Sequence, residues 1–359
     1  MHTQSNLRLL VVRVGAMGDI LHALPAVTAL RRAHPGWIID WVVEPRWRAL
    51  LATEDSDGRD TGAACAHQPV VDRLHFASTK EWRRKPFAST TRAEIATLRR
   101  DLQAGHYDAA IDLQGAIRSA VVARLSGARR RIGEAEPRER AARLFFTERV
   151  ATRGAHVIEQ DFELAAAIAG DDLVYTQPML PCDSAAEAWA EDLLASSAER
   201  PAVLINPGAG WGAKRWPVER YAAVAQALAA RGCRVLVNAG PGEEPLAQAI
   251  LQQTAGAATP LYSSLERLIA VTRRIALLIA GDTGPLHLAC ALGKPVVGIY
   301  GPTDPSRNGP FGTRFSVLRS PASVRDHTRH EAPEAGLLTI QPDDVLRAAV
   351  ALLYPETVL

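Results

Sequence analysis

The chain has 359 residues, a formal net charge of +2 and apolar residues at 47% of its positions. This length predicts two domains of ordinary size, and the composition excludes a disordered chain. The mild charge gives no reason to expect nucleic acid as a partner.

No apolar run reaches the roughly 20 residues that a membrane-spanning helix needs. Polar residues at Met1–Asn6 lead directly into a strand, so no signal peptide is expected. The four cysteines lie far apart and form no CxxC pair, which is typical of a reducing compartment and argues against a zinc site. These features predict a soluble, cytoplasmic protein.

Apolar strands alternate with helical segments in both halves of the chain. The first half opens with a strand at 7–14, a glycine-containing turn at 15–19, a helix at 22–34 and a strand at 37–44, and residues 53–68 form a surface loop. The second half repeats this rhythm from a strand at 202–206. Such alternation predicts α/β architecture, in which parallel sheets carry helices on both faces.

We therefore expect two Rossmann-like βαβ domains. Residues 1–182 form the first domain and residues 183–340 the second. The last segment, 341–359, contains a helix that is expected to pack back on the first half.

The stretch Gly281-Asp-Thr-Gly-Pro-Leu-His287 joins a buried strand to a short helix. A helix that begins at the carboxyl end of a parallel strand points free N–H groups and partial positive charge outward, so this turn predicts a phosphate or diphosphate site. Gly284 lets a ligand approach the backbone, and Asp282 or Thr283 can cap the helix. An ordinary strand-to-helix turn with an aspartate cap is an equally good interpretation.

Two further loops follow strands of the second half. The first, at 206–217, combines glycines with Lys214 and Arg215, and this combination favours phosphate binding over a merely solvated basic turn. In the second loop, Glu243 or Glu244 can accept hydrogen bonds from ribose hydroxyls. Either residue can equally be a first-turn glutamate that the helix dipole stabilises. Neither a dinucleotide fingerprint nor a Walker lysine is present, which argues against an NAD dehydrogenase and against a P-loop nucleoside triphosphatase.

In the first half, Asp19 lies where the first strand turns into the first helix. A carboxylate there can act as a general base or as a helix N-cap, and spacing alone favours the cap. Arginine clusters at 82–85 and 129–143 predict either phosphate or anionic-surface binding or a solvated face. The segment 326–331 fits no ligand spacing of a metal site, so no metal is expected.

Taken together, several motifs give the chain a resemblance to the ADP-heptose:lipopolysaccharide heptosyltransferases over nearly its whole length. The motifs are Met17-Gly-Asp-Ile-Leu-His-Ala-Leu-Pro25, Asp40-Trp-Val-Val-Glu44, Tyr107-Asp-Ala-Ala-Ile-Asp-Leu-Gln-Gly115, Lys214-Arg-Trp-Pro217, Gly281–His287 and Tyr300-Gly-Pro-Thr-Asp-Pro305. The resemblance implies a GT-B fold with two domains facing across a cleft, inversion at the anomeric carbon, and no metal or cofactor. The first half looks like the heptosyltransferase I branch, whereas the 206–217 loop looks more like the heptosyltransferase II branch.

The resemblance also implies roles for individual residues. Asp19 matches the family's general base. The residues that match donor contacts are Ala209, Gly210, Lys214, Glu243, Ser263, Asp282, Thr283, Gly284 and His287. Those expected to contact the acceptor are Gly18, Arg83, Arg84, Gln114 and Arg138.

The expected reaction moves L-glycero-D-manno-heptose from ADP-heptose to Kdo of the anionic glycolipid Kdo2-lipid A. The expected partners are therefore a nucleotide sugar, this acceptor and, peripherally, the cytoplasmic face of the inner membrane, with no nucleic acid. The alternatives are heptosyltransferase II, a GT-B sugar-nucleotide epimerase that needs no acceptor, and a non-catalytic protein that binds an anionic glycolipid.

Overall fold

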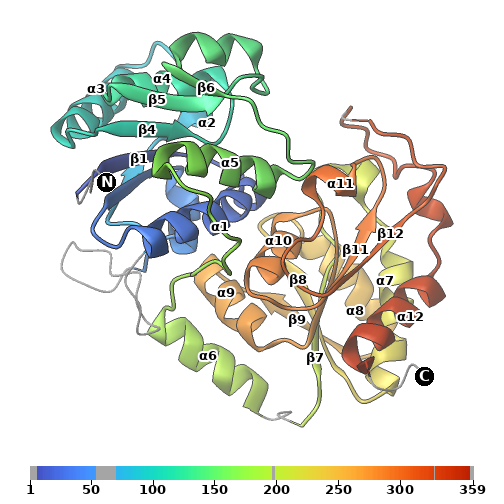
Figure 1. The fold of residues 1–359 in the computed structure, drawn as a ribbon. Helices are drawn as coiled ribbons and strands as arrows, with labels where there is room; N and C mark the ends of the chain where they lie inside the picture. The colour runs from blue at the N-terminus through green and yellow to red at the C-terminus, as the bar shows by residue number, and fades with distance from the viewer. Residues whose placement is uncertain (1–5, 54–69, 196–198, 327, 356–359) are drawn as a thin grey trace. The chain divides into compact units, whose positions relative to one another are not determined.

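The computed structural model describes residues 6–53, 70–195, 199–326 and 328–355. The surface loop expected at 53–68 therefore lies, apart from Thr53, outside the described residues. The chain divides into two compact units, Met1–Asp183 and Ser184–Leu359. Each unit is built on its own six-stranded sheet (Figure 1), which confirms the predicted α/β class.

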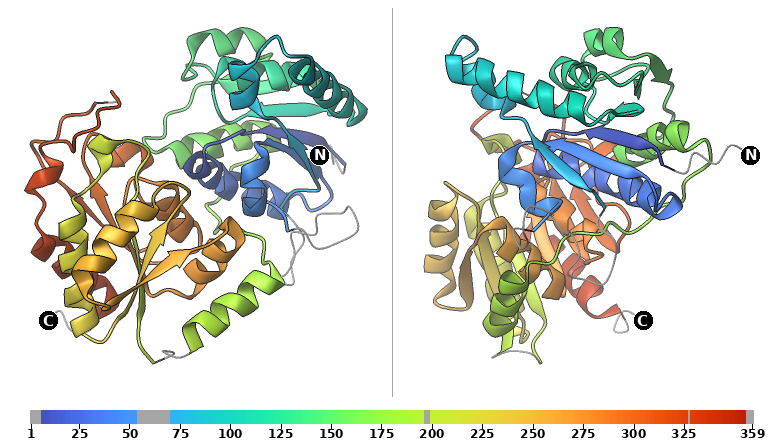
Figure 2. Two further views of the ribbon diagram at one scale, coloured as in Figure 1. Left: turned by 180° about the vertical axis from the view of Figure 1, so that it is seen from behind. Right: turned by 90° about the vertical axis from the view of Figure 1, so that its left-hand side faces the viewer.

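All strands of the first unit are parallel, in the order β3-β2-β1-β4-β5-β6. Helices α1 and α5 pack together on one face, and α3 and α4 lie on the other (Figures 1 and 2). The bounds are β1 Arg8–Val12, α1 Met17–Ala33, β2 Ile38–Val43, β3 Arg73–Phe76, α2 Thr79–Arg84, α3 Ser89–Ala104, β4 Ala109–Asp112, α4 Ile117–Leu125, β5 Arg130–Glu134, β6 Glu148–Val150 and α5 Val157–Ala169, with 3-10 turns η1 Pro45–Leu50 and η2 Arg140–Phe145.

The second unit repeats the design in the order β12-β11-β10-β7-β8-β9, again parallel. Its bounds are α6 Ser184–Ala195, β7 Ala202–Asn206, α7 Val218–Ala230, β8 Arg234–Ala239, α8 Glu244–Thr254, β9 Ala258–Tyr262, α9 Leu265–Arg274, β10 Leu277–Gly281, α10 Gly284–Ala291, β11 Val296–Tyr300, α11 Pro305–Asn308, β12 Phe315–Arg319 and α12 Pro342–Leu353, with 3-10 turns η3 Gly212–Lys214 and η4 Leu337–Thr339.

In both units the central strands are almost continuously apolar. Every residue of β7, β10 and β11 is buried, as a parallel sheet covered on both faces requires. This burial is why the sequence alone locates these strands well. Because all strands run the same way, the loops after β7, β8 and β10 emerge at one edge of the second sheet.

The final helix, α12, packs differently from the expectation. Its buried residues Val345 and Ala349 belong to the apolar core of the second unit, where α12 contacts α7 and the strands β10 to β12. The helix therefore belongs to the second unit, and the apolar face that was expected to pack on the first half is buried in the core of the second. The sequence could show that the helix is amphipathic but not which core it covers.

Three strands were not predicted from the sequence, and all three lie at the edge of a sheet. They are β6, β9 and β12. Strand β9 contains Pro260, and β12 exposes half of Phe315. Edge strands tolerate proline and polar residues because only one side of the strand is paired, so they lack the apolar run that marks a central strand.

None of the helices in the described segments is both long enough and apolar enough to cross a membrane. Cys233 and Cys290 are buried thiols outside any disulfide, and burial raises the pKa of each. Cys182 takes part in a disulfide, which the wide spacing of the cysteines in the sequence did not predict.

Candidate functional site

The loops after three neighbouring strands meet at the carboxyl edge of the second sheet. Strands β7 and β10 pair so that Asn206 stands opposite Ala280. The Asn206 side-chain amide lies 3.5 Å from the Thr283 hydroxyl, and its oxygen accepts a 2.7 Å hydrogen bond from Asn238 at the end of β8. Two buried asparagines thus tie together the loops in which the donor contacts were predicted.

Lys214, Asp282 and His287 form one charged cluster at this edge. The Lys214 ammonium pairs with the Asp282 carboxylate, and each of these side chains is only 10% exposed. His287 Nε2 lies 3.3 Å from the other carboxylate oxygen. Burial alone would raise the pKa of Asp282, but the hydrogen bond with His287 and the charge of Lys214 together hold it well below the usual range.

Helix α10 begins at Gly284 without a side-chain cap. Thr283 occupies the N-cap position, but its hydroxyl is directed to the carbonyl of Gly281, at 3.2 Å, and Asp282 faces Lys214. The expectation that Asp282 or Thr283 caps this helix is therefore wrong. Because no side chain occupies the helix terminus, the Gly284 amide and the partial positive charge of the terminus are left for an anion. Pro285 has no amide hydrogen, and the amides of Leu286 and His287 already donate to the Thr283 carbonyl.

Glu243, at the N-cap position of α8, is directed toward the loop after β7. Its carboxylate accepts a 3.1 Å hydrogen bond from the Gly240 amide. A Cβ at Gly208 would come within 2.1 Å of that carboxylate, so only glycine at position 208 lets the Glu243 side chain lie this close to the backbone of the loop. Glu244 is exposed at the first position of α8. The geometry favours Glu243 over Glu244 as the carboxylate that faces the donor loops.

The remaining predicted donor positions lie around the same edge. Ala209 is buried and Gly210 is exposed within the loop after β7. Ser263 follows the edge strand β9, and its hydroxyl is buried without a hydrogen-bond partner among the described residues. The structure thus brings together the predicted donor residues of the loops after β7, β8 and β10, with Ser263 after β9.

In the first unit, Asp19 is the third residue of α1 and not its N-cap. One carboxylate oxygen accepts a 3.0 Å hydrogen bond from the Ala16 amide. The other lies 3.6 Å from a guanidinium nitrogen of Arg13, which also donates to the Asp19 carbonyl at 3.1 Å. The Asp19 side chain remains 41% exposed. The carboxylate is therefore held in one orientation and is still accessible, as a general base must be.

Gln114 lies beside this turn because its side-chain oxygen accepts a 2.9 Å hydrogen bond from the Val14 amide. Asp112, at the end of β4, holds the backbone that follows it by accepting hydrogen bonds from the amides of Gln114 and Gly115, and it also accepts one from the Ser119 hydroxyl. Complete burial raises the pKa of Asp112 to about 6, even though these bonds oppose the rise. The Gln114 oxygen is thus already used, which leaves its amide nitrogen to donate to a ligand.

The arginines predicted to contact the acceptor are on the surface. Arg138 is exposed, and its backbone packs against Gly115, next to Gln114. Arg83 and Arg84 end α2, the helix that follows β3 at the same sheet edge. Both are exposed, and the only acidic residue in the first turn of α2 is Glu81.

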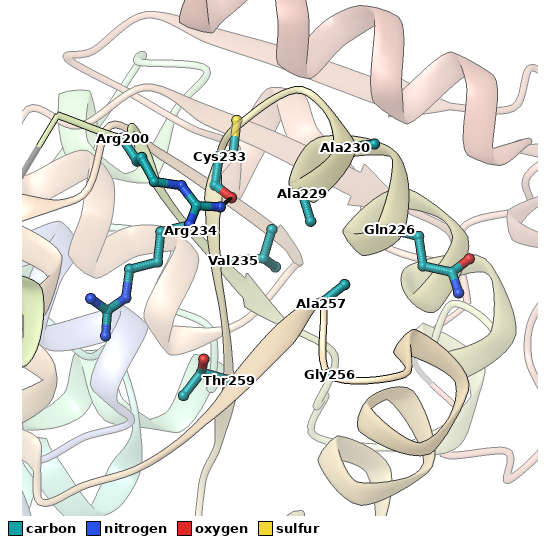
Figure 3. Close-up of a pocket in the computed structure, with 10 residues that line it drawn as sticks. All are labelled: Arg200, Gln226, Ala229, Ala230, Cys233, Arg234, Val235, Gly256, Ala257 and Thr259. Carbon is teal, nitrogen blue, oxygen red and sulfur yellow. Dashed lines mark hydrogen bonds between the residues drawn. The ribbon is translucent and has the colours of Figure 1, made fainter. Parts of the chain in front are cut away.

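A hollow of about 610 Å³ lies elsewhere in the second unit (Figure 3). It opens at the amino ends of β8 and β9, the edge opposite the predicted donor loops. The Arg200 guanidinium is already bonded there to the carbonyls of Gly232 and Cys233. None of the predicted site residues lines this hollow.

Sequence reasoning missed Arg13, Asn206 as an organising residue, and Trp211. Arg13 lies in an apolar segment that was predicted to be a buried strand. A cation is unusual at such a position, so it could have indicated a carboxylate partner nearby. Trp211 lies three residues before Lys214, and the lysine ammonium is 4.2 Å from the centre of its ring. Within the described residues no group of three or more histidine, cysteine or acidic side chains is arranged to hold a metal ion.

The chain is similar to known glycosyltransferases in both sequence and fold. Residues 95–337 match the model of glycosyltransferase family 9 (heptosyltransferase). The chain is 32% identical to lipopolysaccharide heptosyltransferase 1 of Escherichia coli K12 over 325 residues, which cover 88% of this chain and 94% of that protein.

Two solved structures extend the likeness to the whole fold. The E. coli heptosyltransferase WaaC with ADP superposes with a TM-score of 0.78 and 28% identity, over 96% of this chain and 100% of that one. The same enzyme with ADP-2-deoxy-2-fluoro heptose gives a TM-score of 0.75 at 28% identity, over 95% and 98% of the two chains. The fold is GT-B, and the protein is a member of glycosyltransferase family 9, the heptosyltransferases.

Proposed function

We propose that this protein transfers L-glycero-D-manno-heptose from ADP-heptose to Kdo of the lipopolysaccharide inner core, as a heptosyltransferase I. The observation that carries the proposal is the position of Lys214, held by Asp282 beside the uncapped start of α10. The similar E. coli heptosyltransferase WaaC was solved with ADP, and another structure of it holds ADP-2-deoxy-2-fluoro heptose.

The donor diphosphate would bind at the α10 terminus. As the bond between the heptose C1 and the diphosphate oxygen breaks, negative charge develops on the leaving ADP. Lys214 and the Gly284 amide, with the partial positive charge of the α10 terminus, would stabilise that charge without any metal ion. Glu243 would accept hydrogen bonds from the ribose hydroxyls, and Ser263 would meet the adenine through its backbone.

Asp19 would act as the general base. It takes the proton of the acceptor hydroxyl while that oxygen attacks the heptose C1 from the face opposite the diphosphate, which inverts the anomeric centre. The Ala16 amide and Arg13 hold the carboxylate in place for this step. A positioned base contributes roughly 10²–10⁴-fold to such a reaction.

The acceptor is anionic, and Gly18, Gln114, Arg83, Arg84 and Arg138 would bind it. We further propose that the first unit touches the membrane surface peripherally. Phe87 is 90% exposed directly after α2, and Lys80, Arg83, Arg84 and Lys85 are exposed around it. An aromatic side chain among cations fits an anionic lipid interface.

The test is transfer from ADP-L-glycero-D-manno-heptose to Kdo2-lipid A, followed by mass spectrometry. Addition of one heptose supports the proposal. Transfer only to an acceptor that already carries one heptose would favour heptosyltransferase II, and conversion of the donor without an acceptor would favour an epimerase.

Asp19→Asn tests the base, with Glu159→Gln as a matched control. Glu159 is also the third residue of its helix, and its carboxylate accepts a 2.9 Å bond from the His156 amide in the same geometry. We expect Asp19→Asn to lower kcat at least about 100-fold while ADP still binds. Glu159→Gln should retain activity. Near-normal turnover of Asp19→Asn would remove Asp19 as the base.

A further inference from the structure

Two cations approach one aromatic ring beside the predicted diphosphate site. The Lys214 ammonium lies 4.2 Å from the centre of the Trp211 ring, and the Arg329 guanidinium carbon lies 5.9 Å from the same centre. Both distances are within the range of cation–π attraction. Lys214 was expected at the donor, but neither Trp211 nor Arg329 was.

Arg329 reaches the ring because its segment is fixed to the donor loop by the backbone. The Ala213 amide donates to the carbonyl of His330 at 2.9 Å, and the Ala213 carbonyl accepts from the amide of Glu334 at 3.1 Å. A Cβ at Gly212 would come within 1.7 Å of the Glu331 carbonyl oxygen. The residues from 328 to 334, which we call the strap, therefore lie directly on the loop that carries Lys214.

Of the two cations beside Trp211, only Lys214 has an acidic partner among the described residues. Asp282 pairs with Lys214 and offsets most of its charge. In the part of the chain that the structure describes, Arg329 has no carboxylate within ion-pair distance, whereas the guanidinium of Arg325, three residues before the strap, lies 3.9 Å from the Asp304 carboxylate. Arg329 thus adds, beside the donor loop, a positive charge that no carboxylate of the described residues offsets.

The ring itself also carries an unused donor. The indole Nε1 of Trp211 is buried and has no hydrogen-bond partner among the described residues. A buried polar group of this kind normally has a partner, and one that lacks it beside a binding loop is consistent with a ligand that supplies the acceptor. This observation is independent of the charge of Arg329.

We infer that Arg329 is a second phosphate-binding cation of the donor site and that Trp211 is a positioning residue for both cations. The ligand class is a nucleoside diphosphate. A planar guanidinium can bind two phosphate oxygens at once, whereas the Lys214 ammonium acts as a point charge. The inference rests on the proposed function, because it assumes that the diphosphate binds at α10.

The test measures ADP affinity by calorimetry for the full-length protein and its variants. Arg329→Gln should weaken ADP binding on the order of tenfold and raise the KM for the donor with little change in kcat. Arg325→Gln is the matched control, since it removes the same charge from a position that already has an acidic partner, and it should bind ADP like the wild type. Equal affinity in Arg329→Gln and the wild type, or an equal loss in Arg325→Gln, would overturn the inference.

Trp211 is tested by two substitutions and by fluorescence. Trp211→Phe retains an aromatic face and should keep most of the affinity, whereas Trp211→Leu should lose about as much as Arg329→Gln. An ADP-dependent change in tryptophan emission that is present in the wild type and absent in Trp211→Phe would place the ring at the ligand. Equal affinity of the phenylalanine and leucine variants would refute the positioning role. Failure of the wild type to bind ADP would instead refute the proposed donor site.

Discussion

Asp112→Asn is expected to change how the stability of the protein depends on pH. Asp112 is completely buried, and burial raises its pKa from an ordinary 3.8 to about 6. Each pKa unit corresponds to about 1.4 kcal/mol, so this difference is worth about 3 kcal/mol. Asparagine has nearly the same shape and can keep the hydrogen bonds from the amides of Gln114 and Gly115.

The sign follows from proton uptake. Above about pH 6 the carboxylate is ionised in both the folded and the unfolded chain, and the folded state bears the cost of a buried charge. As the pH falls from about 6 to about 4, the folded state binds a proton that the unfolded state does not, so this group increasingly favours folding. The gain is fully present below pH 3.8 and is lost as the pH rises through about 6.

The assay is urea unfolding of the wild type and Asp112→Asn between about pH 4 and pH 7. All other groups are shared, so the difference between the two free energies of unfolding isolates Asp112. We expect that difference to shift by about 2.4 kcal/mol in favour of the wild type as the pH falls from 7 to 4. Ser119→Ala removes a hydroxyl that helps to lower this pKa, so its transition should move to higher pH. Parallel wild-type and Asp112→Asn curves would refute the reasoning.

Three further outcomes are expected. Gly212→Ala would place a Cβ 1.7 Å from the Glu331 carbonyl, so it should destabilise the protein by about 1–3 kcal/mol, whereas Gly210→Ala, with nothing within 4 Å, should leave the melting temperature unchanged; equal melting temperatures would contradict the contact. Phe87→Ser should reduce binding to vesicles that contain anionic lipid, and Val324→Ser, which changes a side chain 69% exposed in the second unit, should not; equal loss would argue against a specific contact by Phe87. Heptose transfer should continue in excess EDTA because Lys214 and the N-terminus of α10 would stabilise the negative charge of the leaving group, and loss of activity restored by a divalent cation would disprove this.

Structure was predicted correctly from the sequence where it depends on residues that are close together in the chain. Strands such as β7 and β10 are fully buried, so their apolar runs identify them directly. The short helix after Gly281 was predicted from Pro285 and the preceding turn, and α10 begins at Gly284. The edge strands β6, β9 and β12 carried no comparable pattern, because only one side of each strand is paired.

The sequence did not predict contacts between residues that lie far apart in the chain. Lys214 and Asp282 are 68 residues apart, and only the pairing of β7 with β10 brings their loops together. The helix cap was predicted wrongly for this reason, since Asp282 pairs with the lysine and leaves the helix terminus open. Arg329 is still further from Lys214 in the sequence, and its position depends on backbone hydrogen bonds that no spacing reveals.

The pairing of Lys214 with Asp282 also bears on selectivity. Because the pKa of Asp282 is held well below its usual range, the carboxylate stays charged at physiological pH and acts as an intramolecular competitor for the lysine. A small anion such as inorganic phosphate must displace this resident carboxylate and gains few other contacts in return. A nucleotide sugar can offset the displacement through its ribose, base and sugar. After the heptose has left, those contacts are fewer, and the return of Asp282 to Lys214 would favour release of the product.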